Sequence, residues 1–516
     1  MKLDEFTSTF NKLPGALPVW HGTVDATQFR SLCEQAVHAG GRLVALWGSD
    51  ESAREARYAL HVLLVTATGL LCLTVPVSAE RPVYPDISDL FPGANRMQRA
   101  VADLLGLHAT GADDQRKWLR HASWPGSVHP LRKDFDGNTV FQTETDAYPF
   151  VTVSGDGVHE IPVGPVHAGT IEPGHFRFSI IGDRVLRLEE RLGYKHKGIE
   201  KRFESMSLEQ GAKLAGRVSG DSTVAYAWAY AMAAESIAGI APPDQALWLR
   251  ALFLERERIH NHLGDLGYLG NDVALAFGFA QFWILKEQVL RNNAMLFGHR
   301  YLMDKIIPGG VTVGLKMQDK RVIEEECNML ERELAVLRSI YEEHTGAQDR
   351  FIGAGCVAPP LAAQLGLCGL PGRASAQAWD ARVQPPCVPY DKLDVQMATH
   401  RNGDVAARVT VRFDELFESL RLQREILINL IGGDELSMPV KQLPGNALGV
   451  GLVEGWRGEV MVALHTDALG NLGRVHPHDP SWQNWPVLEH AILNNIVPDF
   501  PLINKSFNLS YAGQDL

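Results

Sequence analysis

Cysteine is scarce in this chain of 516 residues, and its scarcity excludes several kinds of site. No two of the six cysteines are spaced as a C-x-x-C pair. Neither a disulfide scaffold nor a Cys₄ iron–sulfur site is therefore expected in this chain. The conventional phosphate-loop, G-x-S-x-G, H-E-x-x-H and EF-hand motifs are missing as well, and no GxGxxG follows a strand. The sequence thus offers no nucleotide-binding fingerprint of its own.

Positive charge is also in short supply. The chain has 49 basic against 61 acidic residues, a formal charge of −12. This excess of acid repels a phosphate backbone, so we expect no nucleic-acid partner. The remaining composition, 45% hydrophobic and 21% charged, is that of a globular chain large enough for more than one core.

Long apolar runs are nearly absent. The most membrane-like stretch is Leu60–Val77, which contains His61 and a Thr66–Gly69 break between β-branched residues. These features predict a buried β-hairpin rather than a membrane span. The amino terminus lacks the basic stretch and apolar run of a signal peptide. We therefore expect a cytoplasmic subunit that reaches the membrane only through partner subunits.

The order of periodic segments predicts an α+β protein with two domains. Residues 25–38 read as a capped amphipathic helix, and a strand at 42–47 and the hairpin follow it, which indicates a small α/β domain over 1–140. Residues 141–160 read as a linker, and 161–516 as a large, mainly helical domain. A β-rich entrance opens that domain, with strands around His167 and at 175–181. Long helices are predicted over 203–239, 244–268, 274–304, 319–344 and 412–432.

Several longer segments resemble one known family. GPVHAGTIEPGHFRF, RLGYKHKGIEKRFE and RALFLERERIHNHLGDLG are similar to segments of the large subunit of membrane-bound [NiFe] hydrogenases of the formate hydrogenlyase type. They are equally similar to the quinone-site subunit of respiratory complex I. In the first domain, YPDISDLFPGAN and HPLRKDF resemble the accessory subunit that is fused ahead of the large subunit in formate hydrogenlyase. The resemblance implies a hydrogenase large-subunit-like fold over most of the chain.

The hydrogenase side of this resemblance implies a metal centre whose ligands this chain lacks. A [NiFe] centre needs four thiolates, from R-x-C-G-x-C and D-P-C-x-x-C segments, and the corresponding segments here are RVSGDS and NLSYAG. A serine hydroxyl stays protonated near neutral pH and is a hard, weak ligand, whereas nickel is held by soft, anionic sulfur. We therefore expect no bound metal. The four ligand positions are occupied by Ser219, Ser222, Ser510 and Gly513.

The complex I side of the resemblance implies a quinone site. His167 matches the histidine of a loop that reaches the quinone headgroup, and Asp272 matches the aspartate that partners this histidine. A carboxylate-supported imidazole can deliver a proton to a quinone oxygen. The chain departs from the pattern at Val218, where complex I has a tyrosine as second donor. The structural alternative is that His167 caps a turn and Asp272 caps a helix beginning near Val273.

Three further residues match the family pattern, each with a structural alternative. Glu172 could line a proton route beside the former metal cavity, or stabilise the entrance of a strand. Arg373 and Asp380 match positions near the active cavity and are candidate cofactor-binding residues. If buried, they would need mutual pairing with Arg382, and a structural ion network is the alternative.

The resemblance implies a subunit of a membrane-bound oxidoreductase related to complex I and hydrogenase. No cofactor is expected on this chain; electrons would come from a [4Fe–4S] cluster in a small partner subunit, quinone would be the substrate, and NAD would belong to the complex as a whole. Antiporter-like membrane subunits are the other expected partners. The alternative is a non-catalytic scaffold that couples a redox module to an ion-pumping membrane arm.

Overall fold

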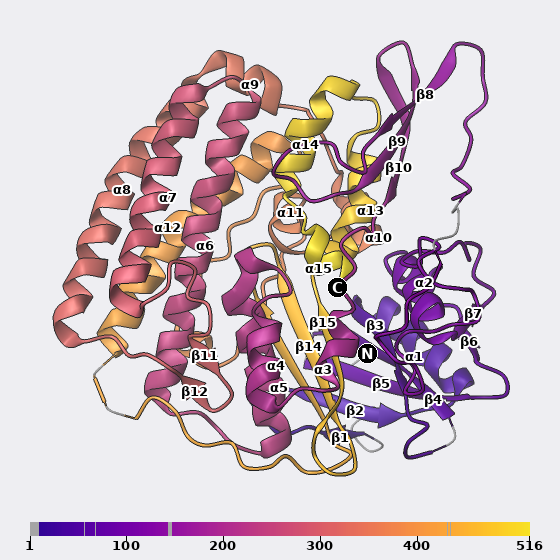
Figure 1. Cartoon of the computed structure of the whole chain (residues 1–516). Coiled ribbons are helices and arrows are strands. Elements are labelled where there is room, and N and C mark those ends of the chain that lie inside the picture. Colours follow the sequence, from indigo (N-terminus) through magenta and orange to yellow (C-terminus); the bar gives the residue numbers. More distant parts are fainter. Residues whose placement is uncertain (1–9, 56, 68, 143–146, 431, 434) are drawn as a thin grey trace.

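A computed structural model describes residues 10–55, 57–67, 69–142, 147–430, 432–433 and 435–516 (Figure 1). The first nine residues, part of the segment from which no signal peptide was expected, lie outside this range, as do residues 143–146 of the expected linker. The described chain mixes helices and sheets, so the prediction of an α+β fold is confirmed.

The N-terminal domain is built on a five-stranded sheet with the strand order β1-β2-β5-β4-β3. The predicted hairpin is confirmed, because β4 and β5 pair antiparallel with His61 opposite Thr74. The predicted helix is α1, whose cap Asp25 accepts from the backbone N–H of Gln28 while the Gln28 side chain accepts from Asp25 N. The elements of this domain are β1 (Asn11–Lys12), β2 (Val19–Thr23), α1 (Ala26–His38), β3 (Arg42–Asp50), β4 (Arg57–Thr66), β5 (Gly69–Ser78), β6 (Val83–Pro85), α2 (Ala94–Leu105) and β7 (His108–Thr110).

A three-stranded antiparallel sheet follows, and Figure 1 shows it projecting from the rest of the molecule. Its strands are β8 (Val158–Val163), β9 (His175–Ile181) and β10 (Arg184–Arg191). The strand predicted at 175–181 is confirmed, but the strand expected around His167 is wrong. Gly164 has a φ of 86° and Pro165 has no backbone N–H, so the ladder ends at Val163 and His167 lies in a loop.

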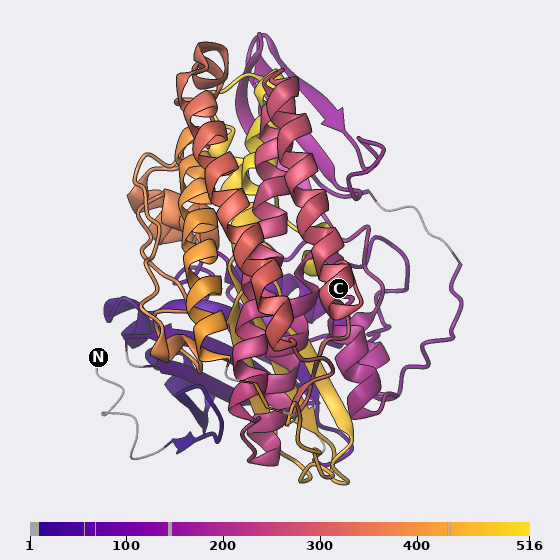
Figure 2. The same cartoon turned by 90° about the vertical axis from the view of Figure 1, so that its left-hand side faces the viewer.

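The long helices α6 (Asp244–Asp272), α7 (Ala276–Phe297), α8 (Lys320–Glu343) and α12 (Val405–Asn429) form the body of the large domain and lie side by side in both views (Figures 1 and 2). On α8 the buried side chains recur every three or four residues, which places one face against the neighbouring helices. The helix expected over 203–239 is interrupted: α4 ends at Ala215, and a 3₁₀ turn over Gly220–Ser222 precedes α5. The helices are α4 (Leu208–Ala215), α5 (Thr223–Ala238), α6 (Asp244–Asp272), α7 (Ala276–Phe297), α8 (Lys320–Glu343) and α12 (Val405–Asn429).

A three-stranded antiparallel sheet near the carboxyl end was not predicted. It comprises β13 (Leu448–Glu454), β14 (Glu459–Thr466) and β15 (Leu472–His478), and α5 packs on β13 and β14. A Cβ on Gly449 or Gly451 would lie 2.1 or 2.0 Å from the carbonyl oxygens of Ala233 and Ala229. These glycines therefore permit the close approach of α5 to the sheet.

Short elements complete the large domain: α3 (Ile199–Phe203), β11 (Ile306–Ile307), β12 (Gly310–Val311), α9 (Thr345–Phe351), α10 (Pro359–Leu365), α11 (Gly369–Ala374), α13 (Ser481–Ala491), α14 (Phe500–Phe507) and α15 (Tyr511–Asp515). Within the described residues, no helix combines the length and the apolar character needed to cross a membrane.

Candidate functional site

The segments that correspond to the metal-binding motifs meet at the amino terminus of α5. Ser219 Oγ and Ser510 Oγ lie 2.9 Å apart, although 291 positions separate the two residues. Ser510 caps α15 by accepting from the backbone N–H of Gly513 at 2.9 Å. Ser222 accepts from Arg457 Nη1 at 3.3 Å. All four positions therefore belong to one cluster of polar contacts.

An ion pair that the sequence analysis missed lies at the centre of this cluster. Arg457, between β13 and β14, places Nη2 2.5 Å from Asp221 Oδ2, and Ser219 Oγ donates to Asp221 Oδ1 at 2.8 Å. Burial acts to raise the pKa of Asp221, but the charge of Arg457 and the serine hydrogen bond outweigh it and lower the pKa. The guanidinium also donates to Asn508 O at 2.6 Å. Arg457 thus ties the two motif segments together.

The position of the fourth thiolate is closed to a side chain. A Cβ on Gly513 would lie 2.3 Å from Asp479 Oδ2, and Tyr226 donates to the same oxygen at 2.8 Å. The donor set consists of serine hydroxyls and a carboxylate that an arginine already pairs. Such hard or neutralised oxygens do not fit a nickel–iron centre, which requires several thiolates.

His167 lies against the same carboxyl-terminal segment. Its Nε2 is 3.4 Å from the hydroxyl of Tyr511, and its ring meets the ring of Phe176 edge-on at 5.4 Å between centroids. Burial lowers the pKa of His167, which favours the neutral imidazole. Because Tyr511 directly follows Ser510, the loop that carries His167 is held beside the former ligand positions. Sequence reasoning missed Tyr511, since nothing in the motif marks it.

Glu172 comes from the same loop and binds the amino terminus of α15. Its Oε2 accepts from the backbone N–H of Ala512 at 2.9 Å, and Oε1 lies 3.5 Å from Lys195 Nζ. A carboxylate in this place satisfies one of the free N–H groups of the helix start. Glu172 therefore fastens the loop of His167 to α15.

Asp272 lies outside the polar cluster and the loop of His167. It is the last residue of α6 and lines an open cleft of about 830 Å³ together with Arg350 and Asp499. Burial raises the pKa of Asp272. Among the described residues, no hydrogen bond or ion pair joins it to His167. The capping alternative is wrong, because α7 begins at Ala276 and its cap position is Leu275.

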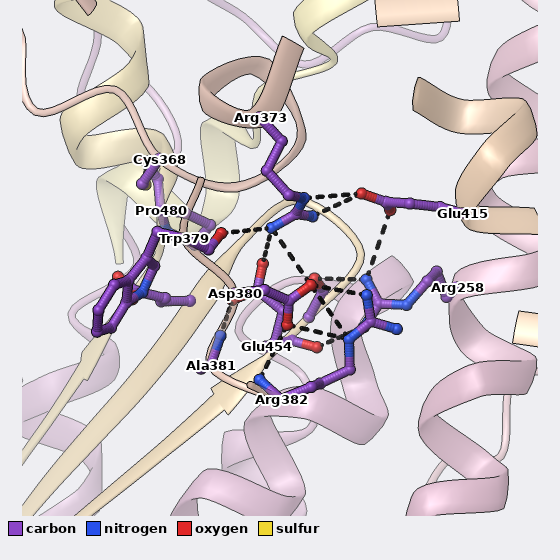
Figure 3. A network of polar contacts seen from close by, with 12 residues as sticks. Arg258, Cys368, Arg373, Trp379, Asp380, Ala381, Arg382, Glu415, Glu454 and Pro480 are labelled. Atoms are coloured by element: carbon purple, nitrogen blue, oxygen red, sulfur yellow. Dashed lines mark hydrogen bonds and ion pairs between the residues drawn. The ribbon is translucent and has the colours of Figure 1, made fainter. Parts of the chain in front are cut away.

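Arg373 and Asp380 lie in a fully buried ion network (Figure 3). Arg373 donates to Glu415 and Glu454 at 2.7 Å each, and its Nη1 is 3.6 Å from Asp380. Asp380 is also paired with Arg382 at 2.7 Å. The network joins α11, the loop after it, α12 and β13. Both candidate cofactor-binding residues are thus fully engaged with protein groups.

The helix α6 extends this network through an unusual run of buried polar side chains. His262 Nε2 lies 2.8 Å from Glu415 Oε2, and Arg258 donates to the backbone carbonyl of Glu454 at 2.7 Å. His262 and Arg258 thus each have a partner on another element, as buried polar groups require. The buried polar residues of α6 are Arg250, Glu255, Arg256, Glu257, Arg258, His260, Asn261, His262 and Asp265.

Glu257 connects α6 to the former metal position. Its carboxyl group accepts from the backbone N–H groups of Val224 at 2.7 Å and Ala225 at 3.2 Å, at the start of α5. Burial raises the pKa of Glu257 to about 8, and the negative charge of Asp221 adds to the rise. At neutral pH this carboxyl group therefore holds a proton beside the polar cluster.

Comparison with known proteins shows the class of subunit to which this chain belongs. Residues 272–445 match the family model described as respiratory-chain NADH dehydrogenase, 49 Kd subunit, and residues 23–140 match the 30 Kd subunit. The chain is 30% identical to formate hydrogenlyase subunit 5 of Escherichia coli over 92% of this chain and 85% of the relative. The chain therefore belongs to this family of fused complex I- and hydrogenase-related subunits.

Other relatives support the same assignment. The C/D subunit of the NADH-quinone oxidoreductase of Phocaeicola vulgatus is 28% identical over 78% of this chain and 80% of the relative. A protein from the structure of the membrane-bound sulfane sulfur reductase, an archaeal respiratory membrane complex, has the same fold with a TM-score of 0.66 and 24% identity, and the match covers 70% of this chain and 99% of that one. The relatives are parts of oxidoreductase complexes.

Proposed function

We propose that this chain is a subunit of a complex I-like membrane oxidoreductase that passes electrons from a small iron–sulfur partner to quinone or a similar acceptor, without a nickel–iron centre. The observation that carries the proposal is the polar cluster at the former ligand positions. Ser219 bonds to Ser510, Arg457 neutralises Asp221, and Asp479 closes the site at Gly513. This cluster satisfies its own hydrogen bonds and leaves no soft ligand.

The acceptor site that fits best is the loop of His167. Reduction of a quinone takes two electrons and two protons, and a [4Fe–4S] cluster in the partner supplies the electrons. A tyrosine hydroxyl that donates to His167 Nε2 leaves the ring proton on Nδ1. As Nδ1 gives its proton to one quinone oxygen, Nε2 takes the tyrosine proton, and solvent then returns a proton to Tyr511 and supplies the second quinone proton. Tyr511 thereby supplies the second donor hydroxyl, which complex I has on a tyrosine at the position of Val218. Asp272 supports the histidine only if the loop moves toward α6 in the assembled complex.

The remaining parts of the proposal concern the membrane partners and NAD, and they rest on the resemblance to the family. Antiporter-like membrane subunits hold the chain on the inner face of the cell membrane, and any NAD chemistry belongs to another subunit of the complex. A second candidate function, a scaffold that carries no acceptor, is favoured by Val218, which stands where complex I has a tyrosine.

Reduction of a soluble quinone by the purified complex tests the proposal. His167→Ala is expected to lower the rate roughly 100-fold, because a general acid typically contributes about this factor to the rate. Tyr511→Phe keeps the ring and should cause a smaller decrease. His159→Ala, on the exposed face of β8, is the matched control and should leave the rate unchanged. An undiminished rate in His167→Ala, with a quinone analogue that fails to bind, supports the scaffold instead.

A further inference from the structure

Three possible metal ligands from both domains meet where the N-terminal sheet packs on the carboxyl-terminal sheet. Figure 1 shows β3 beside β14 and β15. Glu51 directly follows β3, His61 lies on β4 and His465 on β14. One donor atom from each lies within 4.8 Å of the other two, and the described part of the chain holds no second group of this kind. The motifs that identify the family do not involve these residues.

The hydrogen bonds around His61 orient its ring for a ligand. Nδ1 lies 3.0 Å from Thr74 Oγ1, which in turn lies 2.9 Å from His21 Nε2. A ring that donates from Nδ1 to Thr74 directs the lone pair of Nε2 toward Ser49 and Glu51. Ser49 Oγ lies 2.8 Å from this Nε2 and 2.6 Å from Glu51 Oε1, and its single hydroxyl proton serves only one of them; a cation bound at Nε2 would leave that proton to Glu51. Metal-bound histidines are typically held by such a second partner.

The second imidazole, His465, lies against Trp47. The indole N–H donates to His465 Nε2 at 3.4 Å, and the indole ring stacks on His61 and on His476 at centroid distances of 5.2 and 5.3 Å. The ring centroids of His61 and His465 are 4.6 Å apart. A neutral ring that accepts at Nε2 carries its proton on Nδ1, so a cation would bind His465 at Nε2 and replace the long indole contact.

The positive charge of Arg474 lies near His465. Arg474 itself is paired with Glu200 at 2.6 Å, and this pairing reduces its repulsion of a bound cation.

We propose that Glu51, His61 and His465 form a site for a divalent first-row transition-metal cation, which fastens the N-terminal domain to the carboxyl-terminal sheet. Two imidazoles and one carboxylate match the ligand preference of Zn²⁺, with water as a fourth ligand. Mg²⁺ prefers oxygen ligands throughout and is a poor match. Because Glu51 and His465 are partly exposed, solvent offers an entry path. The site is independent of the proposed quinone chemistry.

Calorimetric titration of the chelator-treated full chain with Zn²⁺ tests this site. One equivalent should bind, and the unfolding temperature should rise with Zn²⁺ but not with Mg²⁺. Glu51→Gln and His465→Gln should each weaken binding at least tenfold, and Thr74→Val, which removes the second partner of His61, about tenfold. His108→Ala, an exposed histidine of the same domain, should bind Zn²⁺ as the unaltered chain does.

Two outcomes contradict the proposal: no saturable binding of one Zn²⁺, or equal affinity in Glu51→Gln and His465→Gln. The unfolding temperature of each variant, measured without metal, shows whether that variant is folded. Glu51→Gln changes a partly exposed side chain by one atom and keeps the test valid if His465→Gln fails to fold. The visible spectrum of Co²⁺ in place of Zn²⁺ gives a second readout, since loss of an imidazole ligand changes it.

Discussion

Arg373→Ala is expected to lower the free energy of unfolding by about 3–5 kcal/mol, the usual cost of removing one partner of a buried ion pair. Arg373 is fully buried and contacts three carboxylates, Glu415, Glu454 and Asp380. Without the guanidinium these groups are left uncompensated in a space that water does not reach. Arg373→Lys should recover only part of the loss, because an ammonium cannot reproduce the planar, forked contacts. Urea unfolding of the purified chain measures both variants.

Arg291→Ala is the control for this prediction. Arg291 also pairs with a glutamate, Glu287, but 75% of its side chain is exposed. Exposed pairs contribute little, so the free energy of unfolding should change by less than about 0.5 kcal/mol. A loss below about 1 kcal/mol in Arg373→Ala would show that the ion network does not hold the scaffold.

Glu257 is expected to make the folded chain less stable as pH rises. Its pKa in the folded chain is about 8, above the 4.5 of an ordinary glutamate. Between these values the unfolded chain binds fewer protons than the folded chain, so the free energy of unfolding falls as pH increases. The contribution is fully present below pH 4.5 and lost above pH 8. Its size is on the order of 5 kcal/mol.

Glu257→Gln should remove this part of the pH dependence. The slope of stability against pH is the readout rather than stability itself, because the amide cannot accept from both backbone N–H groups at the start of α5. Glu333→Gln, on the exposed face of α8, makes the same Glu-to-Gln replacement and should keep the slope. Parallel curves for Glu257→Gln and the unaltered chain would contradict the raised pKa.

Local patterns predicted those elements whose burial follows from their own sequence. The β4–β5 hairpin is an example, because an apolar run with a central break between β-branched residues has few alternatives. The sheet β13–β15 escaped prediction. Its strands are buried on both faces, so polar and apolar residues do not alternate along them.

The candidate site was predictable only in part. The serine and glycine at the ligand positions could be named because they stand inside family motifs. Arg457 and Asp479 could not, since their roles depend on contacts over more than 200 positions, with Asp221 and Tyr226. The same holds for Arg373: its type suggested pairing, but Glu415 and Glu454 come from separate elements. Sequence patterns identify charged residues that need partners when buried. Which residues those partners are is shown only by the fold.

The central claim is that the polar cluster at the positions of the metal-binding motifs holds no nickel. The nickel content of the complex tests it most directly. The intact complex, purified from cells supplied with nickel and analysed for metals, should contain far less than one nickel per chain. That result follows from the replacement of all four thiolates at Ser219, Ser222, Ser510 and Gly513. One nickel per chain, lost when Ser219 and Ser510 are both replaced by alanine, would contradict the account.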